Sequence, residues 1–406
     1  MPQSRSTQKR GLISKVLLLL LVIYLVDISL GLPDSLLGSG WPDMHLDLNV
    51  PASYAGFITM IIAANTIISS LLSTRMTLKF GAGVVTFISI LLTAIAMLGF
   101  SLSNQFFMLC LWAIPYGLGA GAIDAATNNF VALHYNSRQL NWLNSFWGVG
   151  TIISPAIMGE SLSTSGGWHL GYVIVGSIQL TIAVIVFCSL PLWRQTEAHH
   201  RKIVGESKQI SNRQMTKVPG MWAAILAFFA YSTIEQTTGL WASTFLVQTH
   251  DLDIVTVAKA GSLFYIGITV GRFIAGIISN RVGDYWLTSV GYSIIAIGIV
   301  MLLLPHTGYA FAMVGLVIVG LGCAPIWPAI LHSTPTNFGI EHSQTAMGIQ
   351  MAAAYTGTTT MPPVFGWLAG MVGMKLFPIF LLLFLLICAL ATKRLKALVS
   401  RDHQGL

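Results

Sequence analysis

Four acidic residues lie well inside the hydrophobic segments of this 406-residue chain, which has only 14 aspartates and glutamates. They are Asp27, Asp34, Asp124 and Glu235. A carboxylate near the middle of a membrane helix costs roughly 2.5–3.5 kcal/mol on insertion scales, and ionisable groups within membranes usually serve transport. We therefore expect these side chains to face a polar cavity between helices. For Asp124 and Asp27 the alternative is a buried structural carboxylate that is hydrogen-bonded to a neighbouring helix, and for Asp34 it is a position in water toward the external end of the segment.

Asp124 lies in a hydrophobic run from about position 106 to 133, and Asn128 follows one turn later on the same helix face. Three small residues that allow close approach of another helix or a ligand precede them: Gly117, Gly119 and Gly121. A low-dielectric cavity disfavours the charged form of a carboxyl group, so Asp124 is expected to load and release a coupling proton. Asn144 in the next segment is expected to hydrogen-bond the carboxyl group.

The first hydrophobic segment has an acidic face, because Asp27, Gly31 and Asp34 occupy positions i, i+4 and i+7. Pro33 removes one backbone hydrogen bond and frees the carbonyl group of Ser29, so a bend beside Asp34 is expected. Asp34 is expected to sense the substrate or to hold a second proton. For Asp27, a role in proton coupling and a purely structural role are both open.

A face suited to a polyol is expected on the seventh segment, where Tyr231, Glu235 and Thr238 align. Its carboxylate accepts hydrogen bonds from hydroxyls, and aromatic rings cover C–H faces. In the tenth segment, Pro325 and Pro328 break the helix, which is tolerated at membrane depth where the backbone lines a cavity. The candidates for substrate binding, drawn from both halves of the chain, are Asn128, Asn144, Glu235, Gln236, Trp327, Gln350 and Tyr355.

The roles of three residues in the second half need separate discussion. Trp327 either stacks on a ring of the substrate or packs against protein side chains. His332, near the end of the tenth segment, is expected to be interfacial or structural rather than a proton relay. Arg272 is the only basic residue deep in a segment, and it is expected to pair with one of the acids or to be structural.

The composition is that of a polytopic membrane protein. Hydrophobic residues make up 54% of the chain and charged residues 9%, against about 25% charged residues in a soluble domain. The four cysteines lack disulfide or metal-ligand spacing, and no Walker loop or nucleophile elbow is present, so we expect no enzyme, no cofactor and no metal. The expected transmembrane segments are twelve, at about 15–38, 54–74, 83–102, 106–133, 142–162, 168–191, 219–247, 258–279, 286–304, 308–334, 343–368 and 371–392.

Basic residues indicate the orientation of these segments. All lysines and arginines except Lys259, Arg272 and Lys375 lie before the first segment, after the last, or in alternate loops, and the positive-inside rule places those regions in the cytoplasm. Both termini are then cytoplasmic. Trp41 and Trp168, near the external ends, are expected to be anchors at the membrane interface.

An internal duplication divides the chain. The expected domains are a six-helix bundle at 1–190, a cytoplasmic linker loop at 191–218, and a second six-helix bundle with a short tail at 219–406. Gly117-Leu-Gly119 recurs as Gly320-Leu-Gly322, and the acid and glycine of segment 1 match Glu235 and Gly239. Two pseudo-symmetric bundles place a transporter's substrate site near the midplane between the repeats.

The loop after the eighth segment resembles the signature of the major facilitator superfamily, Gly-x-x-x-Asp-Arg-x-Gly. It reads Gly276-Ile-Ile-Ser-Asn-Arg-Val-Gly283, with Asn280 in place of the aspartate. The resemblance implies an all-α, twelve-helix integral membrane fold and a gating loop formed by Asn280, Arg281 and Gly283. The counterpart in the first half is more degraded and keeps Lys79-Phe-Gly81.

A stretch of the fourth segment resembles the fucose–proton symporter (fucose/galactose/glucose) family, whose motif there is Gly-Leu-Gly-x-Leu-Glu-Thr-Ala-Ala-Asn-Pro-Phe-Val. Asp124 falls on the glutamate and Asn128 on the asparagine, while Asn129 replaces the proline. Pro33-Asp34-Ser-Leu-Leu and Asn144-Ser145-Phe146 also match. The resemblance implies proton-coupled uptake of a hexose or deoxyhexose, with one carboxylate in segment 1 for binding and coupling and one in segment 4 that takes the proton.

The resulting hypothesis is a secondary active transporter that moves a small polar solute, with a sugar favoured, by proton-coupled symport and alternating access. The alternatives are a proton-coupled exporter of drugs or metabolites and a non-transporting membrane sensor. Ser154 stands before Pro155 where such exporters usually have glycine, which weakens the exporter reading. The expected partners are a small-molecule substrate, protons and the lipid bilayer, and no nucleic acid is expected. The protein is expected to be a functional monomer in the cytoplasmic (inner) membrane.

Overall fold

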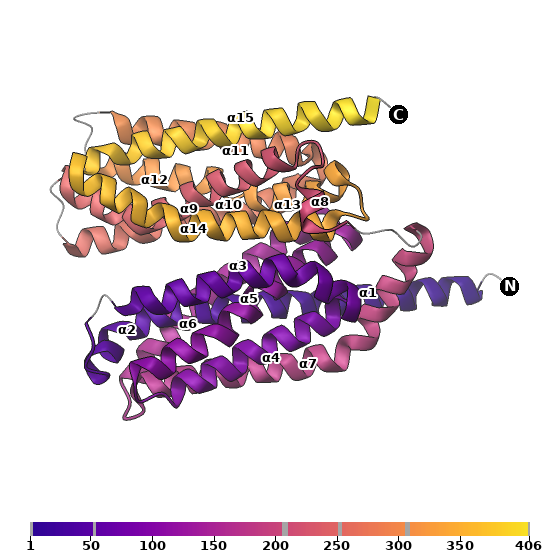
Figure 1. Cartoon of the computed structure of the whole chain (residues 1–406), viewed down its shortest axis with the longest axis horizontal. Coiled ribbons are helices and arrows are strands. Elements are labelled where there is room, and N and C mark those ends of the chain that lie inside the picture. The colour runs from indigo at the N-terminus through magenta and orange to yellow at the C-terminus, as the bar shows by residue number, and fades with distance from the viewer. Residues whose placement is uncertain (1–2, 52–53, 205–209, 251–253, 305–308, 405–406) are drawn as a thin grey trace. The chain divides into compact units, whose positions relative to one another are not determined.

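The computed structural model describes residues 3–51, 54–204, 210–250, 254–304 and 309–404, and every regular element in them is a helix (Figure 1). The chain divides into two compact units. Unit 1 consists of Met1–Phe130 and Leu143–Lys208, and unit 2 of Val131–Trp142 and Gln209–Leu406. In each unit the long helices run side by side (Figure 1).

Helices α1 to α7 follow the first half of the chain, at Gln3–Asp34, Leu36–Asp47, Ala55–Phe80, Ala82–Ser101, Phe106–His134, Ser137–Leu162 and Gly167–Val204. Helices α8 to α15 follow the second half, at Asn212–Met215, Met221–His250, Ile254–Val282, Asp284–Leu303, Tyr309–Cys323, Ile326–Phe338, Ser343–Val372 and Phe377–Gln404. A 3₁₀ turn at Met374–Leu376 precedes α15. The stretch Val131–Trp142, in which α5 passes into α6, belongs to unit 2, although the chain on both sides of it belongs to unit 1.

Nine stretches of the described residues are long and apolar enough to cross a membrane. Two of them combine consecutive α-helices: Leu17–Trp41 runs from α1 into α2, and Tyr309–Phe338 combines α12 with α13. Helices α6, α9 and α14 have 26, 30 and 30 residues and so are also long enough, but they are more polar. These three helices complete the twelve predicted segments. Each of them carries at least one candidate site residue, among them Asn144, Glu235 and Gln350.

The helix is interrupted at Ser35, next to Asp34, where the sequence predicts a bend. Helix α1 ends at Asp34, and α2 begins two residues later. The carbonyl group of Ser29, which Pro33 leaves without its helical donor, accepts a hydrogen bond at 2.8 Å from the side-chain nitrogen of Gln179 on α7. A neighbouring helix thus satisfies the polar group that the proline frees, which is how membrane helices tolerate proline.

The repeated glycines set close helix crossings in the same way in both units. A Cβ atom on Gly117 of α5 would lie 2.3 Å from a carbonyl oxygen of α3, and one on Gly119 would lie 2.6 Å from a carbonyl oxygen of α4. In unit 2, a Cβ atom on Gly320 would lie 2.2 Å from a carbonyl oxygen of α10, and one on Gly322 would lie 2.7 Å from one of α11. The repeated glycines therefore perform the same packing role in each half, and they admit helices rather than a ligand.

Helix α7 continues past the predicted end of segment 6, through Pro191 to Val204. Trp193 is 1% exposed and packs where a side chain on Gly83 would lie. The Glu197 carboxylate accepts a hydrogen bond at 2.7 Å from the backbone nitrogen of Ala82, the first residue of α4. Contacts with α4 thus keep this polar stretch helical where the sequence predicted a loop.

The prediction that Trp41 and Trp168 anchor the membrane interface is wrong. Their exposed fractions are 7% and 3%, so both side chains belong to the core of unit 1. The indole nitrogen of Trp168 donates to the carboxylate of Asp47 at 3.0 Å, and its ring stacks on His169. Tryptophan at the end of a segment has the same sequence signal whether it faces lipid or a neighbouring helix.

Candidate functional site

In unit 1 the acid of α5 is tied to two asparagines. Asp124 is 9% exposed, and Asn128 is fully buried. The side-chain nitrogen of Asn128 donates to Oδ1 of Asp124 at 2.7 Å and to the backbone carbonyl of the same residue at 2.9 Å. The side-chain oxygen of Asn128 accepts a hydrogen bond at 3.3 Å from Nδ2 of Asn144 on α6. Asn128 is therefore a bridge between the carboxylate and α6.

Hydroxyl groups of α3 fasten α5 beside this carboxylate. Thr66 and Ser70 donate to the carbonyl groups of Gly117 and Gly121 at 3.2 Å each, and Ser69 donates to the carbonyl group of Leu118. A carbonyl oxygen has two lone pairs, so it can accept such a bond in addition to one from its own helix. The backbone that carries Asp124 is thereby held against α3.

Asp34 is in a different environment, because its side chain is exposed on unit 1 and both of its oxygens are held by aromatic donors. The hydroxyl group of Tyr116 on α5 donates to Oδ1 at 2.7 Å, and the indole nitrogen of Trp147 on α6 donates to Oδ2 at 2.8 Å. Tyr116 is 5% exposed, and Trp147 is half-buried. Hydrogen bonds to an ionised carboxylate are among the stronger ones, so the carboxylate is fixed in direction.

Asp27 is buried, with an exposed fraction of 3%, two turns before Asp34 on α1. The acidic face of α1 therefore has one member inside the core of unit 1 and one at its surface. Proton coupling by Asp27 stays a prediction.

In unit 2 the deep acid and the deep base are paired, as the sequence predicts for Arg272. One guanidinium nitrogen of Arg272 on α10 lies 3.3 Å from a carboxylate oxygen of Glu235 on α9, and the side chains are 6% and 11% exposed. Removing one partner of a buried pair leaves an uncompensated charge, at a cost of about 3–5 kcal/mol. Glu235 thus holds the cation in place, besides any contact that it makes with a solute.

Aromatic side chains pack beside this ion pair. Trp327 on α13 is half-buried, with its ring centroid 4.4 Å from that of Phe228 and 6.3 Å from that of Tyr231. Packing against protein is therefore one role of Trp327. The hydroxyl group of Tyr231 donates at 3.0 Å to the carbonyl group of Cys323, the last residue of α12. The break between α12 and α13, which the prolines predict, is capped by this bond.

The other predicted site residues of unit 2 are placed as follows. Gln236 and Tyr355 are half-buried, whereas Gln350 is 1% exposed and accepts a hydrogen bond at 2.9 Å from Thr334. In the predicted gating loop, Arg281 is exposed and Gly283 has a φ of 77°, a conformation that favours glycine. Asn280 accepts a hydrogen bond at 3.3 Å from the backbone nitrogen of Arg138. Among the described residues, no three metal-ligating side chains lie together.

Tyr116 and Trp147 are site residues that the sequence analysis missed. Each belongs to a helix that carries a predicted site residue, Asp124 on α5 and Asn144 on α6. Aromatic residues are common in hydrophobic segments, so their type alone does not distinguish them from packing residues. The nearest sequence signal for Trp147 was the match of Asn144-Ser145-Phe146 to the symporter motif, which ends at the residue directly before it.

The long apolar helices of the described residues, with carboxylates among them, define a polytopic membrane protein. The model of the Major Facilitator Superfamily matches residues 20–308 and 256–403, so the chain belongs to this superfamily. The Saccharomyces cerevisiae Bypass of stop codon protein 6 is 20% identical over 68% of this chain, and the Bacillus subtilis glucose/mannose transporter GlcP is 21% identical over 60%. Each match spans 61% of the relative's length. The Salmonella typhimurium membrane sensor protein UhpC is 22% identical over 46% of each chain.

Solved structures share the fold. The Escherichia coli fucose:proton symporter FucP superposes with a TM-score of 0.70 and 15% identity, covering 93% of this chain and 98% of that one. The proton:xylose symporter XylE, solved with 6-bromo-6-deoxy-D-glucose, superposes with a TM-score of 0.74 and 13% identity, covering 95% and 96%. The fold and the superfamily are thus those that the sequence resemblance implied.

Proposed function

We propose that this transporter moves a neutral sugar together with protons by alternating access. The observation that carries the proposal is the pairing, within unit 1, of a buried carboxylate that is bridged to another helix with an exposed carboxylate that two aromatic donors hold. The buried carboxylate, Asp124, is suited to binding a proton. The exposed carboxylate, Asp34, is suited to accepting hydrogen bonds from hydroxyl groups of the solute. The likeness to fucose, xylose and glucose/mannose transporters supports a sugar as the solute.

Asn128 provides a way for the proton on Asp124 to be sensed elsewhere. In the observed arrangement the Asn128 amide group donates to the carboxylate and accepts from Asn144. A proton on Oδ1 of Asp124 would turn that oxygen into a donor, which faces a donor unless the amide group of Asn128 turns over. The turned amide group would present its nitrogen to Asn144, which must then turn as well. Protonation is thereby passed from α5 to α6 as a reversal of hydrogen bonds.

The charges favour a neutral solute over an anion. Three of the four deep acids, Asp27, Asp34 and Asp124, belong to unit 1, and no lysine or arginine of the chain lies deep in the segments of that unit. In unit 2 the deep charges are Glu235 and Arg272, which neutralise each other. Like charges repel strongly where water is scarce, so a carboxylated or sulfonated solute would be bound less well than a polyol.

The test is transport by reconstituted vesicles that contain the wild-type protein or Asp124→Asn. The amide mimics the protonated carboxyl group but cannot release a proton. Asp124→Asn should therefore lose accumulation of sugar against a gradient, by about tenfold or more, while it retains exchange of labelled for unlabelled sugar. Asp43→Asn, which removes an exposed acid of the same unit, serves as the matched control and should keep both activities.

The same vesicles separate the alternatives. Sugar-dependent proton uptake supports a symporter, proton movement opposite to the solute supports an exporter, and no proton movement supports a sensor. Undiminished accumulation by Asp124→Asn would exclude Asp124 as the proton carrier and leave Asp34 or Asp27 in that role.

A further inference from the structure

In unit 2, exposed lysines and exposed aromatic rings lie together where the end of α15 meets the start of α11. The Nζ atom of Lys396 on α15 lies 3.7 Å from the centroid of the Tyr285 ring on α11. Tyr285 and the next residue, Trp286, have exposed fractions of 44% and 48%. Lys393 precedes Lys396 by one turn on the same face of α15, and both lysines are exposed. These four residues are named here the α11–α15 basic face.

The two helices that carry this face are held against each other. Figure 1 shows α11 and α15 side by side within the unit. The hydroxyl oxygens of Tyr292 on α11 and Thr392 on α15 are hydrogen-bonded at 2.8 Å, next to Lys393. A cation above an aromatic ring is attracted by the negative face of the ring, so Tyr285 holds the ammonium group of Lys396 at the start of α11. The positive charges of the face therefore have a defined place.

The face lies at a predicted membrane boundary. Trp286 is the first residue of the predicted ninth segment, and Lys393 directly follows the twelfth. Toward the middle of the membrane the neighbouring surface is apolar: Leu386 and Leu390 of α15 and Ile297 of α11 are all more than half exposed. Tryptophan and tyrosine favour the headgroup level, and lysine extends its ammonium group toward water. The order from apolar to aromatic to basic is that of acyl chains, interface and phosphate in a phospholipid.

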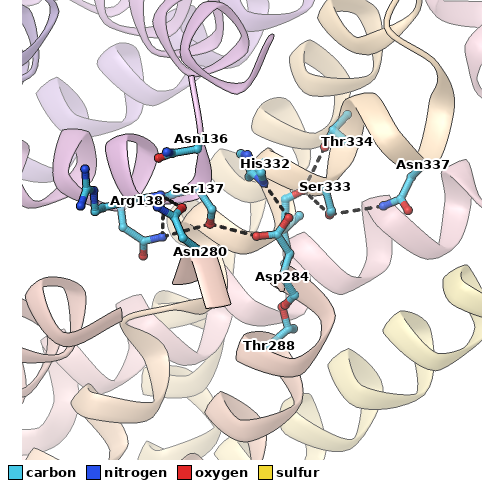
Figure 2. A network of polar contacts seen from close by, with 12 residues as sticks. Asn136, Ser137, Arg138, Asn280, Asp284, Thr288, His332, Ser333, Thr334 and Asn337 are labelled. Carbon is cyan, nitrogen blue, oxygen red and sulfur yellow. Dashed lines mark hydrogen bonds and ion pairs between the residues drawn. The ribbon is translucent and has the colours of Figure 1, made fainter. Parts of the chain in front are cut away.

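The acid at the start of α11 does not cancel the lysines. Oδ2 of Asp284 lies 2.6 Å from Nδ1 of His332, and its Oδ1 accepts a hydrogen bond at 3.0 Å from Ser137, so both oxygens of the carboxylate are engaged elsewhere (Figure 2). Arg281 and Arg394, near the same two helix ends, are exposed and add positive charge. An anionic group beside the lysines is therefore attracted.

We propose that the α11–α15 basic face is a binding site for an anionic phospholipid, with the phosphate on Lys393 and Lys396 and the acyl chains along Leu386 and Leu390. Lysines at the membrane surface attract anionic lipids, and basic sites between transmembrane helices bind their headgroups. Charge placement predicts that the lipid belongs to the cytoplasmic leaflet. The site is independent of the proposed sugar transport, because none of its residues belongs to the candidate functional site.

The experiment measures which lipid lies beside Trp286. Its fluorescence is the difference between the full-length protein and the Trp286→Phe variant, which cancels the signal of the remaining tryptophans. The protein is reconstituted in phosphatidylcholine vesicles with rising fractions of brominated phosphatidylglycerol or brominated phosphatidylcholine, whose bromine atoms quench nearby indoles. Each lysine at the surface should favour the anionic lipid about fivefold, the equivalent of about 1 kcal/mol. Half-quenching should therefore need about 25-fold less of the brominated phosphatidylglycerol.

Substitutions in the face separate its two parts, each measured against its own Trp286→Phe background. Lys393→Gln and Lys396→Gln should each lower the preference for phosphatidylglycerol about fivefold, and the double variant should remove it. Tyr285→Phe keeps a ring below Lys396 and should keep the preference. Tyr285→Leu removes the ring and should lower the preference about two- to fivefold.

Arg213→Gln is the matched control, because it removes one exposed positive charge of the same unit, on α8, outside the face. It should keep the full preference. Equal quenching by the two brominated lipids in the wild-type protein would overturn the site, and so would an undiminished preference in the double lysine variant. A loss in Arg213→Gln as large as that in Lys396→Gln would also overturn it, because the attraction would then belong to the overall charge. The substituted lysines are exposed, so these variants should fold, and their melting temperatures in detergent check this.

Discussion

Asp34 and Asp124 are both carboxylates in apolar helices, yet their neighbours suit them to different tasks. The donors to Asp34 are a phenol and an indole, whose rigid rings fix the direction of each oxygen. The donor to Asp124 is an amide group, which can reverse its polarity in place. A fixed acceptor is useful for binding hydroxyls, and a reversible partner is useful for a group that gains and loses a proton.

Replacement of Trp147 by phenylalanine tests the fixed acceptor. Trp147→Phe keeps an aromatic ring but removes the N–H group that holds Oδ2 of Asp34. We expect a loss of about 1 kcal/mol, or roughly fivefold in apparent sugar affinity, with expression unchanged. Trp168→Phe removes an equivalent bond to Asp47 and is the matched control in a competition assay. Equal affinities for Trp147→Phe and the wild type would remove Asp34 and its ring donors from the binding site.

At the scale of helices, the contact of α1 with α6 brings Trp147 to Asp34. A Cβ atom on Gly31 would lie 2.1 Å from the backbone oxygen of Trp147, and one on Gly150 would lie 2.3 Å from the backbone oxygen of Ile28. The two glycines thus allow backbone-to-backbone packing, which places the indole ring within reach of the carboxylate. The matched residue Gly239 of α9 instead faces the hydroxyl group of Tyr265, so the two units differ at this position.

A single methyl group at this crossing should separate the two helices. Gly31→Ala cannot be accommodated without moving the backbone of α6, and overpacking of this kind typically costs about 1–3 kcal/mol. We expect a lower melting temperature in detergent and weaker sugar binding. Gly148→Ala, on α6 two residues from Gly150, meets no atom within 4 Å and should leave both unchanged. A Gly31→Ala protein as stable as Gly148→Ala would show that the crossing tolerates displacement.

At the scale of the whole molecule, the distribution of lysine and arginine makes a prediction about topology. The linker between the two halves should be cytoplasmic, because the six basic residues between segments 6 and 7 lie in it. A cysteine at position 205, which lies outside the described residues, should react with an impermeant reagent only from the inside. A cysteine in place of Ser165, which lies between the fifth and sixth predicted segments on the side opposite the basic loops, supplies the control position for labelling of intact cells. Reaction at position 205 in intact cells would reverse the predicted topology.

Several features were already determined by the sequence because their causes are local. Hydrophobic length predicts the twelve segments, Pro33 predicts a bend beside Asp34, and the glycines of α5 predict a close crossing. The same reasoning predicted the acids as the unusual groups, since the cost of a carboxylate in an apolar helix depends on the helix that carries it. The predictions for Trp41, for Trp168 and for the end of α7 were wrong, because neighbouring helices determine the surroundings of these residues and their own segments do not.

Only the tertiary structure decided which partner each polar group meets. Asp34 meets Tyr116 and Trp147 across 82 and 113 residues of chain, and the carbonyl group of Ser29 meets Gln179 across 150. The sequence shows that such groups need partners, because an unsatisfied polar group in an apolar environment costs several kcal/mol. It does not show which partner, because many side chains of suitable chemistry are available and the choice follows from how closely the helices cross. Asp284 is the clearest case: its sequence context is that of an ordinary loop acid, yet its carboxylate accepts a hydrogen bond at 3.0 Å from Ser137 and lies 2.6 Å from Nδ1 of His332 (Figure 2).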